Sequence, residues 1–209
     1  MRQIPLPLGT VQKGSAREAG RIVVGTSLQP VIDALGVPER WPFRTALLSG
    51  PPRSGKSLLA RWFAASNPGA EAIDPADSLP EDELFHRWNR AQADGHPLLL
   101  VSDRAPGAWR IALPDLASRL GAALHLEIAP PDDELLAGLI EEHAARGGLT
   151  VGPDVIAYLL PRIERSHIEA EQLVQTIDRL SLERKAGVTI SLARDALAER
   201  GGEWQPRLL

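Results

Sequence analysis

A glycine-rich segment carries the strongest chemical signal in the sequence. Gly50, Gly55, Lys56 and Ser57 have the spacing G-x-x-x-x-G-K-S, directly after an apolar run and before a segment with helical periodicity. In this pattern the glycines let backbone N–H groups turn inward around an oxyanion, and the N-terminus of the following helix adds its partial positive charge. The pattern therefore predicts a phosphate-binding loop and a nucleotide site.

The side chains of this loop have separate expected roles. We expect Lys56 to reach the β- and γ-phosphates of a nucleotide and the Ser57 hydroxyl to bind Mg²⁺. Arg53 and Ser54 lie inside the loop and join the predicted nucleotide-binding residues. A glycine-rich turn that binds nothing is the alternative, but such a match arises by chance in only about one chain in a hundred of this length.

Nucleotide hydrolysis would also need an acidic metal ligand and an oriented water. Asp74 follows the strand candidate at 70–73 and is the natural metal ligand. That strand is poorly apolar, and Pro75 stands where a second acid would usually follow, so an ordinary Asp-Pro turn is the alternative. Asp77 is a weaker substitute. The sequence therefore supports nucleotide binding more firmly than turnover.

A parallel sheet is needed to position these residues. Buried-strand candidates are separated by segments with helical periodicity and lie at 45–49, 70–73, 97–102 and 124–128. Strands that alternate with helices predict a doubly wound, parallel α/β fold. Before the first of these strands, Ser27 is placed to cap a helix that Gly36 ends.

A helical region follows Pro130 and Pro131. Helices are expected there at 132–146, 153–163, 166–185 and 191–199, and Pro161 should kink or break the second of them. Proline and glycine interrupt the start of the chain, where we expect a flexible arm. The predicted domains are an arm at 1–20, an α/β base at 21–129 and a helical subdomain at 130–209.

Composition excludes several other kinds of protein. The chain has no cysteine, which rules out disulfides, thiol nucleophiles and cysteine-bound zinc or iron–sulfur sites. Its five histidines lack the spacing of a helical metal pair, and its net charge of −4 argues against a nucleic-acid coat protein. No apolar run is long enough to span a bilayer, and the start has no secretory signal. We therefore expect a cytoplasmic protein.

Further segments resemble the DnaA family of AAA+ replication initiators. Residues 22–27 (I-V-V-G-T-S) resemble the segment that packs around adenine in that family, which adds Val24 and Gly25 to the predicted nucleotide-binding residues. Residues 98–106 (L-L-L-V-S-D-R-A-P) resemble the sensor-1 strand, with Asp103 at its end. The resemblance implies that Asp103 senses the nucleotide.

The octet L-P-D-L-A-S-R-L at 113–120 is the most specific of these segments. It resembles the box that carries the arginine finger in the family, which implies that Arg119 acts on the nucleotide of a partner molecule. A surface arginine that caps a short helix before Gly121 is the alternative. Together the matches cover about residues 20–200, and they imply an AAA+ base followed by a helical lid subdomain.

The first residues resemble a sliding-clamp-binding peptide, Q-x-[SP]-L-P-L. Gln3, Leu6, Pro7 and Leu8 match its pattern. The two prolines favour an extended backbone and lower the cost of ordering it, and the two leucines can fill an apolar pocket. An unremarkable tail containing proline and leucine is the alternative.

Within the DnaA family, the arm and a chain expected to end with the lid resemble the regulators that inactivate DnaA. This resemblance implies a bacterial, replisome-associated protein that binds ADP or ATP with Mg²⁺ and is recruited by the sliding clamp, the beta subunit of DNA polymerase. It would stimulate hydrolysis of DnaA-bound ATP and so repress re-initiation of replication. We expect no sequence-specific DNA binding and no membrane association, and we leave a homodimer open. The alternatives are an autonomous P-loop ATPase or phosphotransferase, and a non-catalytic module tethered to the clamp.

The missing second acid at Pro75 and the missing sensor-2 arginine point to weak or absent intrinsic ATPase activity. Between Lys56 and Asp74 there is room for one helix and one strand where the family has a further strand–helix unit, so we expect a four-stranded sheet. The sensor-2 arginine is expected at Ile168 or Glu169, and Arg165 is out of register. We therefore expect a nucleotide, ADP, held as a structural cofactor.

Overall fold

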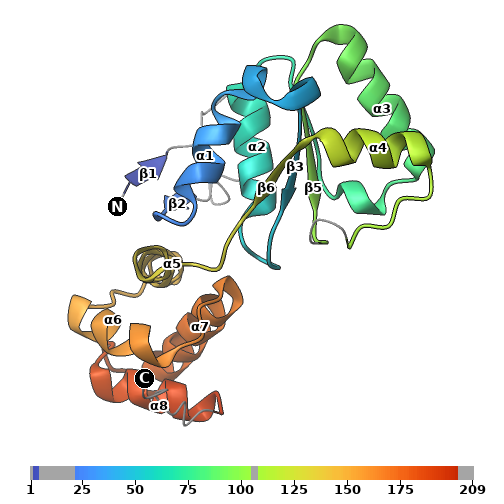
Figure 1. Cartoon of the computed structure of the whole chain (residues 1–209). Helices are drawn as coiled ribbons and strands as arrows, with labels where there is room; N and C mark the ends of the chain where they lie inside the picture. The colour runs from blue at the N-terminus through green and yellow to red at the C-terminus, as the bar shows by residue number, and fades with distance from the viewer. Residues whose placement is uncertain (1, 5–21, 105–107, 202–209) are drawn as a thin grey trace, which may run out of the picture. The chain divides into compact units, whose positions relative to one another are not determined.

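The computed structural model describes residues 2–4, 22–104 and 108–201. These residues form two compact units, which Figure 1 traces. Among the described residues, one is an α/β unit of residues 28–129 with residues 4 and 22, and the other is a helical unit of residues 130–201 with residues 2–3 and 23–27. No helix in the described ranges is both long and apolar enough to pass through a bilayer.

The α/β unit is built on a parallel sheet whose described strands have the order β4-β5-β3-β6. The strands are β3 (Thr45–Ser49), β4 (Glu71–Ile73), β5 (Leu98–Ser102) and β6 (Leu124–Glu127). Every residue of β3 and β5 is buried, as expected for central strands that are covered on both faces. The predicted α/β fold with a four-stranded parallel sheet is confirmed, and the short β4 forms one edge.

Helices and short turns connect these strands. They are α1 (Gln29–Leu35), α2 (Lys56–Ser66), α3 (Glu81–Asp94) and α4 (Pro114–Ala122), with 3-10 turns at Pro38–Arg40, Pro42–Arg44 and Ala76–Ser78. Leu84 of α3 and Leu116 of α4 are fully buried in one apolar cluster with Leu47 and Leu100 of the sheet. Because they share this core, α3 and α4 lie side by side (Figure 1).

The predicted cap of α1 is wrong. Leu28, not Ser27, occupies the N-cap position, and its side chain makes no capping hydrogen bond. The backbone N–H of Ser27 donates instead to the Asp132 carboxylate at 2.8 Å, because residues 23–27 pack with the helical unit. Gly36 ends the helix, as predicted.

The described helical unit contains α5 (Asp133–Arg146), α6 (Pro153–Leu159), α7 (His167–Arg184) and α8 (Ile190–Glu199). The predicted interruption at Pro161 is confirmed, because α6 stops and a 3-10 turn follows at Leu160–Arg162. The side chains of Asp132, Ser166 and Thr189 cap α5, α7 and α8. Apolar residues from all of these helices meet in one core.

Part of the predicted flexible arm is a strand. Arg2–Ile4 form β1, which pairs with β2 (Ile22–Val24), so the expectation of an irregular segment is wrong for these three residues. β2 consists entirely of β-branched residues, which favour strands, and it offers a backbone partner that the local sequence of the arm does not reveal. Gln3 of the clamp-binding-like peptide lies in β1, whereas Leu6, Pro7 and Leu8 lie outside the described residues.

Candidate functional site

The predicted phosphate-binding loop connects β3 to α2, the connection that its motif requires. Gly55 has a backbone φ of +87°, a conformation that side chains disfavour, and Arg53 also lies in the left-handed region at +61°. A Cβ atom on Gly50 would lie only 2.8 Å from the Ile128 Cβ. The loop therefore depends on glycine at both positions that the motif fixes.

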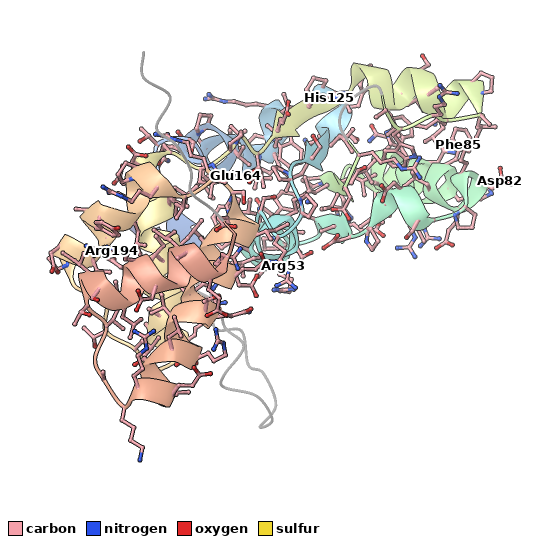
Figure 2. The ribbon with its side chains drawn as sticks, turned by 90° about the horizontal axis from the view of Figure 1, so that it is seen from below. Arg53, Asp82, Phe85, His125, Glu164 and Arg194 are labelled. Carbon is pink, nitrogen blue, oxygen red and sulfur yellow. The ribbon has the colours of Figure 1, made fainter. Side chains whose placement is uncertain are left out.

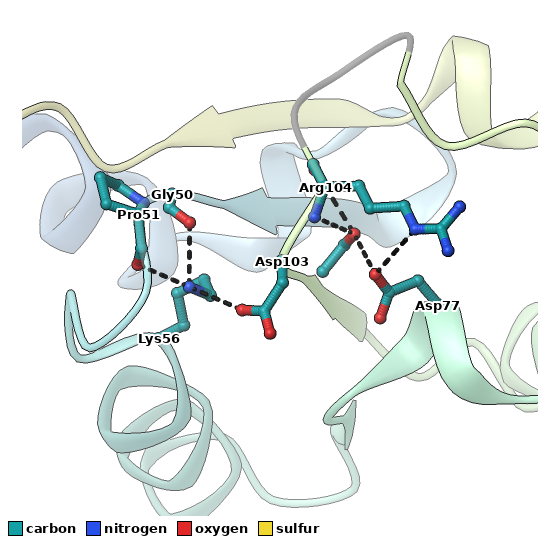
Figure 3. Close-up of polar contacts among 7 residues, drawn as sticks. Gly50, Pro51, Lys56, Asp77, Asp103 and Arg104 are labelled. Atoms are coloured by element: carbon teal, nitrogen blue, oxygen red, sulfur yellow. Dashed lines mark hydrogen bonds and ion pairs between the residues drawn. The ribbon is translucent and has the colours of Figure 1, made fainter.

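Lys56 closes this loop from within. Its ammonium group donates to the carbonyl oxygens of Gly50 at 2.9 Å and Pro51 at 2.8 Å, and it pairs with an Asp103 carboxylate oxygen at 2.9 Å (Figure 3). The Lys56 side chain is only 6% exposed, whereas that of Asp103 is 71% exposed. The positive charge is thus fixed at the loop, whereas its carboxylate partner is open to solvent.

An open pocket of about 490 Å³ lies over the loop. Its lining brings together most of the predicted nucleotide-site residues of the α/β unit, namely Arg53, Ser54, Gly55, Lys56, Ser57, Asp74 and Asp103. Arg61 also lines the pocket and was missed. It follows Ser57 by four residues on α2, and that helical spacing could have identified it. The three cations in this lining suit an anionic ligand.

Ser57 and Asp74 are the predicted metal ligands in this pocket. Ser57 and Asp74 are exposed in its lining, but the described residues contain no group of three histidine or acidic side chains that could bind a metal. Mg²⁺ commonly completes its coordination with nucleotide phosphates and water. The Ser57 and Asp74 oxygens fit this arrangement, and their roles as metal ligands remain predictions.

Asp77, the weaker candidate acid, does not belong to this lining. Its carboxylate accepts a hydrogen bond of 3.1 Å from the Ser102 hydroxyl and lies 3.6 Å from the Arg104 guanidinium (Figure 3). The Ser102 hydroxyl also accepts from the Arg104 backbone N–H at 3.0 Å. These contacts fix the turn after β5, and Asp103 lies in that turn, between Ser102 and Arg104.

Arg119 lies in the last turn of α4 and faces α3. Its guanidinium donates to the Asn89 side-chain oxygen and stacks over the rings of Trp88, 4.2 Å from the centroid, and Phe85, 4.5 Å from the centroid. Figure 2 marks Phe85 on α3. Arg119 is partly exposed, so these contacts hold the group in one orientation without burying it. Sequence reasoning missed Asn89, although its spacing from Phe85 and Trp88 places all three on one helix face.

Gly25, predicted to contact adenine, lies against the start of α5. A Cβ atom on Gly25 would lie 2.5 Å from the Leu135 Cβ, so the backbone approaches α5 more closely than any side chain allows. Asp132 accepts hydrogen bonds from the backbone N–H groups of Leu135 at 2.7 Å and Ser27 at 2.8 Å. One carboxylate thus caps α5 and attaches the segment that contains Val24 and Gly25 to the helical unit.

Replacing Asp132 with alanine is expected to lower the free energy of unfolding by about 1–2 kcal/mol, because the helix cap is lost and a second buried donor loses its acceptor. Burial alone would raise the pKa of Asp132, but the hydrogen bonds from Leu135 and Ser27 outweigh burial and lower the pKa below its ordinary value. The stabilisation is therefore complete above about pH 4 and declines as the pH falls through the lowered pKa.

Denaturant unfolding at pH 7 and at pH 3 measures this effect. Glu141→Ala, an exposed change in the middle of α5, is the matched control. Asp132→Ala should be less stable than Glu141→Ala at pH 7, and the difference should shrink at pH 3. Equal stability of the two variants at pH 7 would contradict the assignment.

The predicted sensor-2 position carries no arginine. Arg165 lies just before α7 and forms an ion pair with Asp133 at 2.8 Å, and Glu169 pairs with Arg200 at 2.7 Å. Both pairs lie within the helical unit. Arg165 and Glu169 are thus each engaged in an ion pair within this unit.

Comparison with curated proteins finds sequence similarity to DnaA proteins. No family model matches the chain. The DnaA proteins of Lactobacillus acidophilus and Lacticaseibacillus casei are 29% identical over 123 residues and 27% identical over 117 residues, which is 57% and 56% of this chain. These matches cover 26% of either DnaA, so the chain spans about a quarter of the length of these curated relatives.

Solved structures show the same fold. Domain III of Thermotoga maritima DnaA matches with a TM-score of 0.69 and 16% identity over 85% of this chain and 94% of that one. Aquifex aeolicus DnaA bound to AMPPCP matches with a TM-score of 0.60 and 19% identity over 78% and 66%. The RuvB branch-migration motor of T. maritima matches with a TM-score of 0.59 and 18% identity over 84% and 70%. The chain is therefore similar in sequence to part of DnaA, and its α/β fold is that of the DnaA AAA+ domain.

Proposed function

We propose that this chain is a regulator of the Hda type, which binds an adenine nucleotide and stimulates hydrolysis of ATP held by DnaA. The observation that carries the proposal is the position of Arg119. This arginine of α4 is held against α3 and is not among the residues that line the chain's own phosphate pocket. An arginine finger in this position would serve the nucleotide of another molecule.

The chemistry expected of Arg119 is electrostatic. Phosphoryl transfer spreads negative charge over the γ-phosphate oxygens, and a fixed guanidinium stabilises that charge in the transition state. Asn89 accepts from one N–H of the guanidinium, which lies over the two rings, and this leaves other N–H groups for phosphate oxygens. We propose DnaA as the partner because the chain is similar to DnaA in sequence as well as in fold.

The chain's own nucleotide would have a structural role. Lys56, Ser57 and the backbone of the loop would hold the phosphates of ADP or ATP, with Asp74 beside the metal and Asp103 reporting on the phosphates. The AMPPCP complex of Aquifex aeolicus DnaA supports an adenine nucleotide for this fold. Gln3, Leu6, Pro7 and Leu8 would bring the protein to the sliding clamp at the replisome in the bacterial cytoplasm, where it would inhibit re-initiation.

Hydrolysis of DnaA-bound ATP in the presence of clamp loaded on DNA tests this function. Two variants distinguish a regulator from an autonomous enzyme and from a recruitment module. One is Arg119→Ala, and the other combines Leu6→Ala with Leu8→Ala, which leaves the β1 residues unchanged. A regulator of the proposed type requires both sites. Stimulation that survives both changes would instead indicate an autonomous enzyme, and dependence on the two leucines alone would indicate a recruitment module.

Intrinsic hydrolysis is expected to be very slow. The purified protein should carry ADP and release phosphate from ATP at no more than the rate of Lys56→Ala, because the acidic strand is short and the sensor-2 arginine is missing. Nucleotide extraction followed by chromatography, together with a phosphate-release assay without DnaA, provides the measurement. Steady turnover that requires Lys56 and Asp74 would contradict this expectation.

A further inference from the structure

The helix that carries Arg119 has no cap of its own. Leu113 occupies the N-cap position of α4 without a side-chain hydrogen bond, and Pro114 follows it without a backbone N–H. The carboxylate that serves this end comes from α3. Glu81 accepts from the backbone N–H of Ala112 at 2.9 Å with one oxygen and from that of Leu113 at 2.7 Å with the other.

This contact fixes α4 relative to α3. Both Glu81 oxygens are engaged, and hydrogen bonds to an ionised carboxylate are stronger than those between neutral groups. The negative charge of Glu81 near the first turn of α4 also interacts favourably with the positive end of the helix dipole. At its other end, α4 is attached to the same helix by the contact of Arg119 with Asn89. The nine residues of α4 are thus tied to α3 at both ends.

We propose that Glu81 is a positioning residue for Arg119, and this proposal rests on the function proposed above. An arginine finger accelerates hydrolysis only when its guanidinium lies within a fraction of an ångström of the position that stabilises the transition state. A shift of about 1 Å caused by a distant change can cost two orders of magnitude in rate. Loss of the Glu81 contact releases the start of α4, and the last turn of that helix moves with it.

The neutral variant Glu81→Gln tests the proposal, because its amide nitrogen cannot accept from the second N–H. Asp82→Asn is the matched control, because Asp82 is exposed and its replacement removes the same charge from the same turn of α3 (Figure 2). In Glu81→Gln, amide hydrogen exchange at residues 112–117 should become about tenfold faster, and the maximal rate of DnaA-bound ATP hydrolysis should fall about tenfold. The concentration for half-maximal stimulation should stay within about twofold.

A double variant separates positioning from general damage. In an Arg119→Ala background, Glu81→Gln should cause no further loss of rate, because the group that it positions is gone. If Glu81→Gln does not fold, Glu81→Asp, which keeps the charge but is one methylene shorter, is expected to show the same pattern with about a threefold loss. Exchange and rate equal to those of Asp82→Asn would overturn the proposal.

Failure of this inference differs from failure of the proposed function. If Arg119→Ala has no effect on hydrolysis of DnaA-bound ATP, the finger role is wrong whatever Glu81 does. If Arg119 is required while the Glu81 variants match Asp82→Asn, only the positioning role is wrong. The exchange measurement needs neither DnaA nor ATP, so it tests the Glu81 contact by itself.

Discussion

Replacing Arg119 with alanine is expected to lower the rate of DnaA-bound ATP hydrolysis about 10³–10⁵-fold relative to the unaltered protein, the usual contribution of an arginine finger. The fold should survive, because each ring contact of a partly exposed guanidinium contributes only about 0.5–1 kcal/mol. Binding of ADP to the chain's own pocket should not change, since Arg119 is not among the residues that line it.

Lysine at this position should not restore activity. The guanidinium of Arg119 lies over the rings of Trp88 and Phe85 and donates to Asn89, and its planar shape suits these contacts. A lysine ammonium is a point charge that cannot stack in this way and cannot present two parallel donors to a phosphate. Arg119→Lys should therefore resemble Arg119→Ala in rate.

Single-turnover hydrolysis of labelled ATP on DnaA measures both variants. Arg90→Ala provides the control, because Arg90 is an exposed arginine on α3 and its replacement removes the same charge. The finger assignment would be refuted if Arg119→Ala kept more than about a tenth of the rate. A loss of equal size in Arg90→Ala would point instead to a general effect of surface charge.

Features that depend on neighbouring residues could be predicted from the sequence. The phosphate-binding loop follows from glycine spacing, a buried strand before it and a helix after it. Ser166 caps α7 through its own hydroxyl, and Pro161 ends α6 through its own ring, so each signal acts within a few residues. The number of strands and their parallel direction followed from the same local patterns together with the family resemblance, whereas their order in the sheet was not predicted.

Features that depend on distant residues could not be predicted. Ser27 is a good capping residue by type, but its backbone N–H is bound by Asp132, 105 positions away. In the sequence, Glu81 is an ordinary acidic residue in the first turn of a helix, and only the fold brings its carboxylate to the Leu113 N–H. The pairing of Lys56 with Asp103 likewise requires β3 and β5 to lie side by side. Side chains that bridge two elements have no signature in either element alone.

Replacing Lys56 with alanine is expected to weaken binding of ADP and ATP about a hundredfold or more. The Lys56 ammonium is nearly buried within the loop, and a charged hydrogen bond to a phosphate contributes about 1.5–3 kcal/mol, more when it serves two oxygens. The carbonyl groups of Gly50 and Pro51 also lose their donor, so the loop itself loses its shape. Titration calorimetry with ADP gives the affinity directly.

The control for Lys56→Ala is Arg194→Ala, which removes an exposed positive charge from α8 (Figure 2). An ADP affinity within about threefold of the unaltered protein in Lys56→Ala would refute the phosphate role of the loop. The two largest effects act on different steps: Lys56→Ala should strongly weaken ADP binding, whereas Arg119→Ala should keep ADP bound and lose only the effect on DnaA. A protein with one shared site for both residues would lose both properties in either variant, so this pair of measurements decides whether Arg119 works on a nucleotide that the chain does not itself hold.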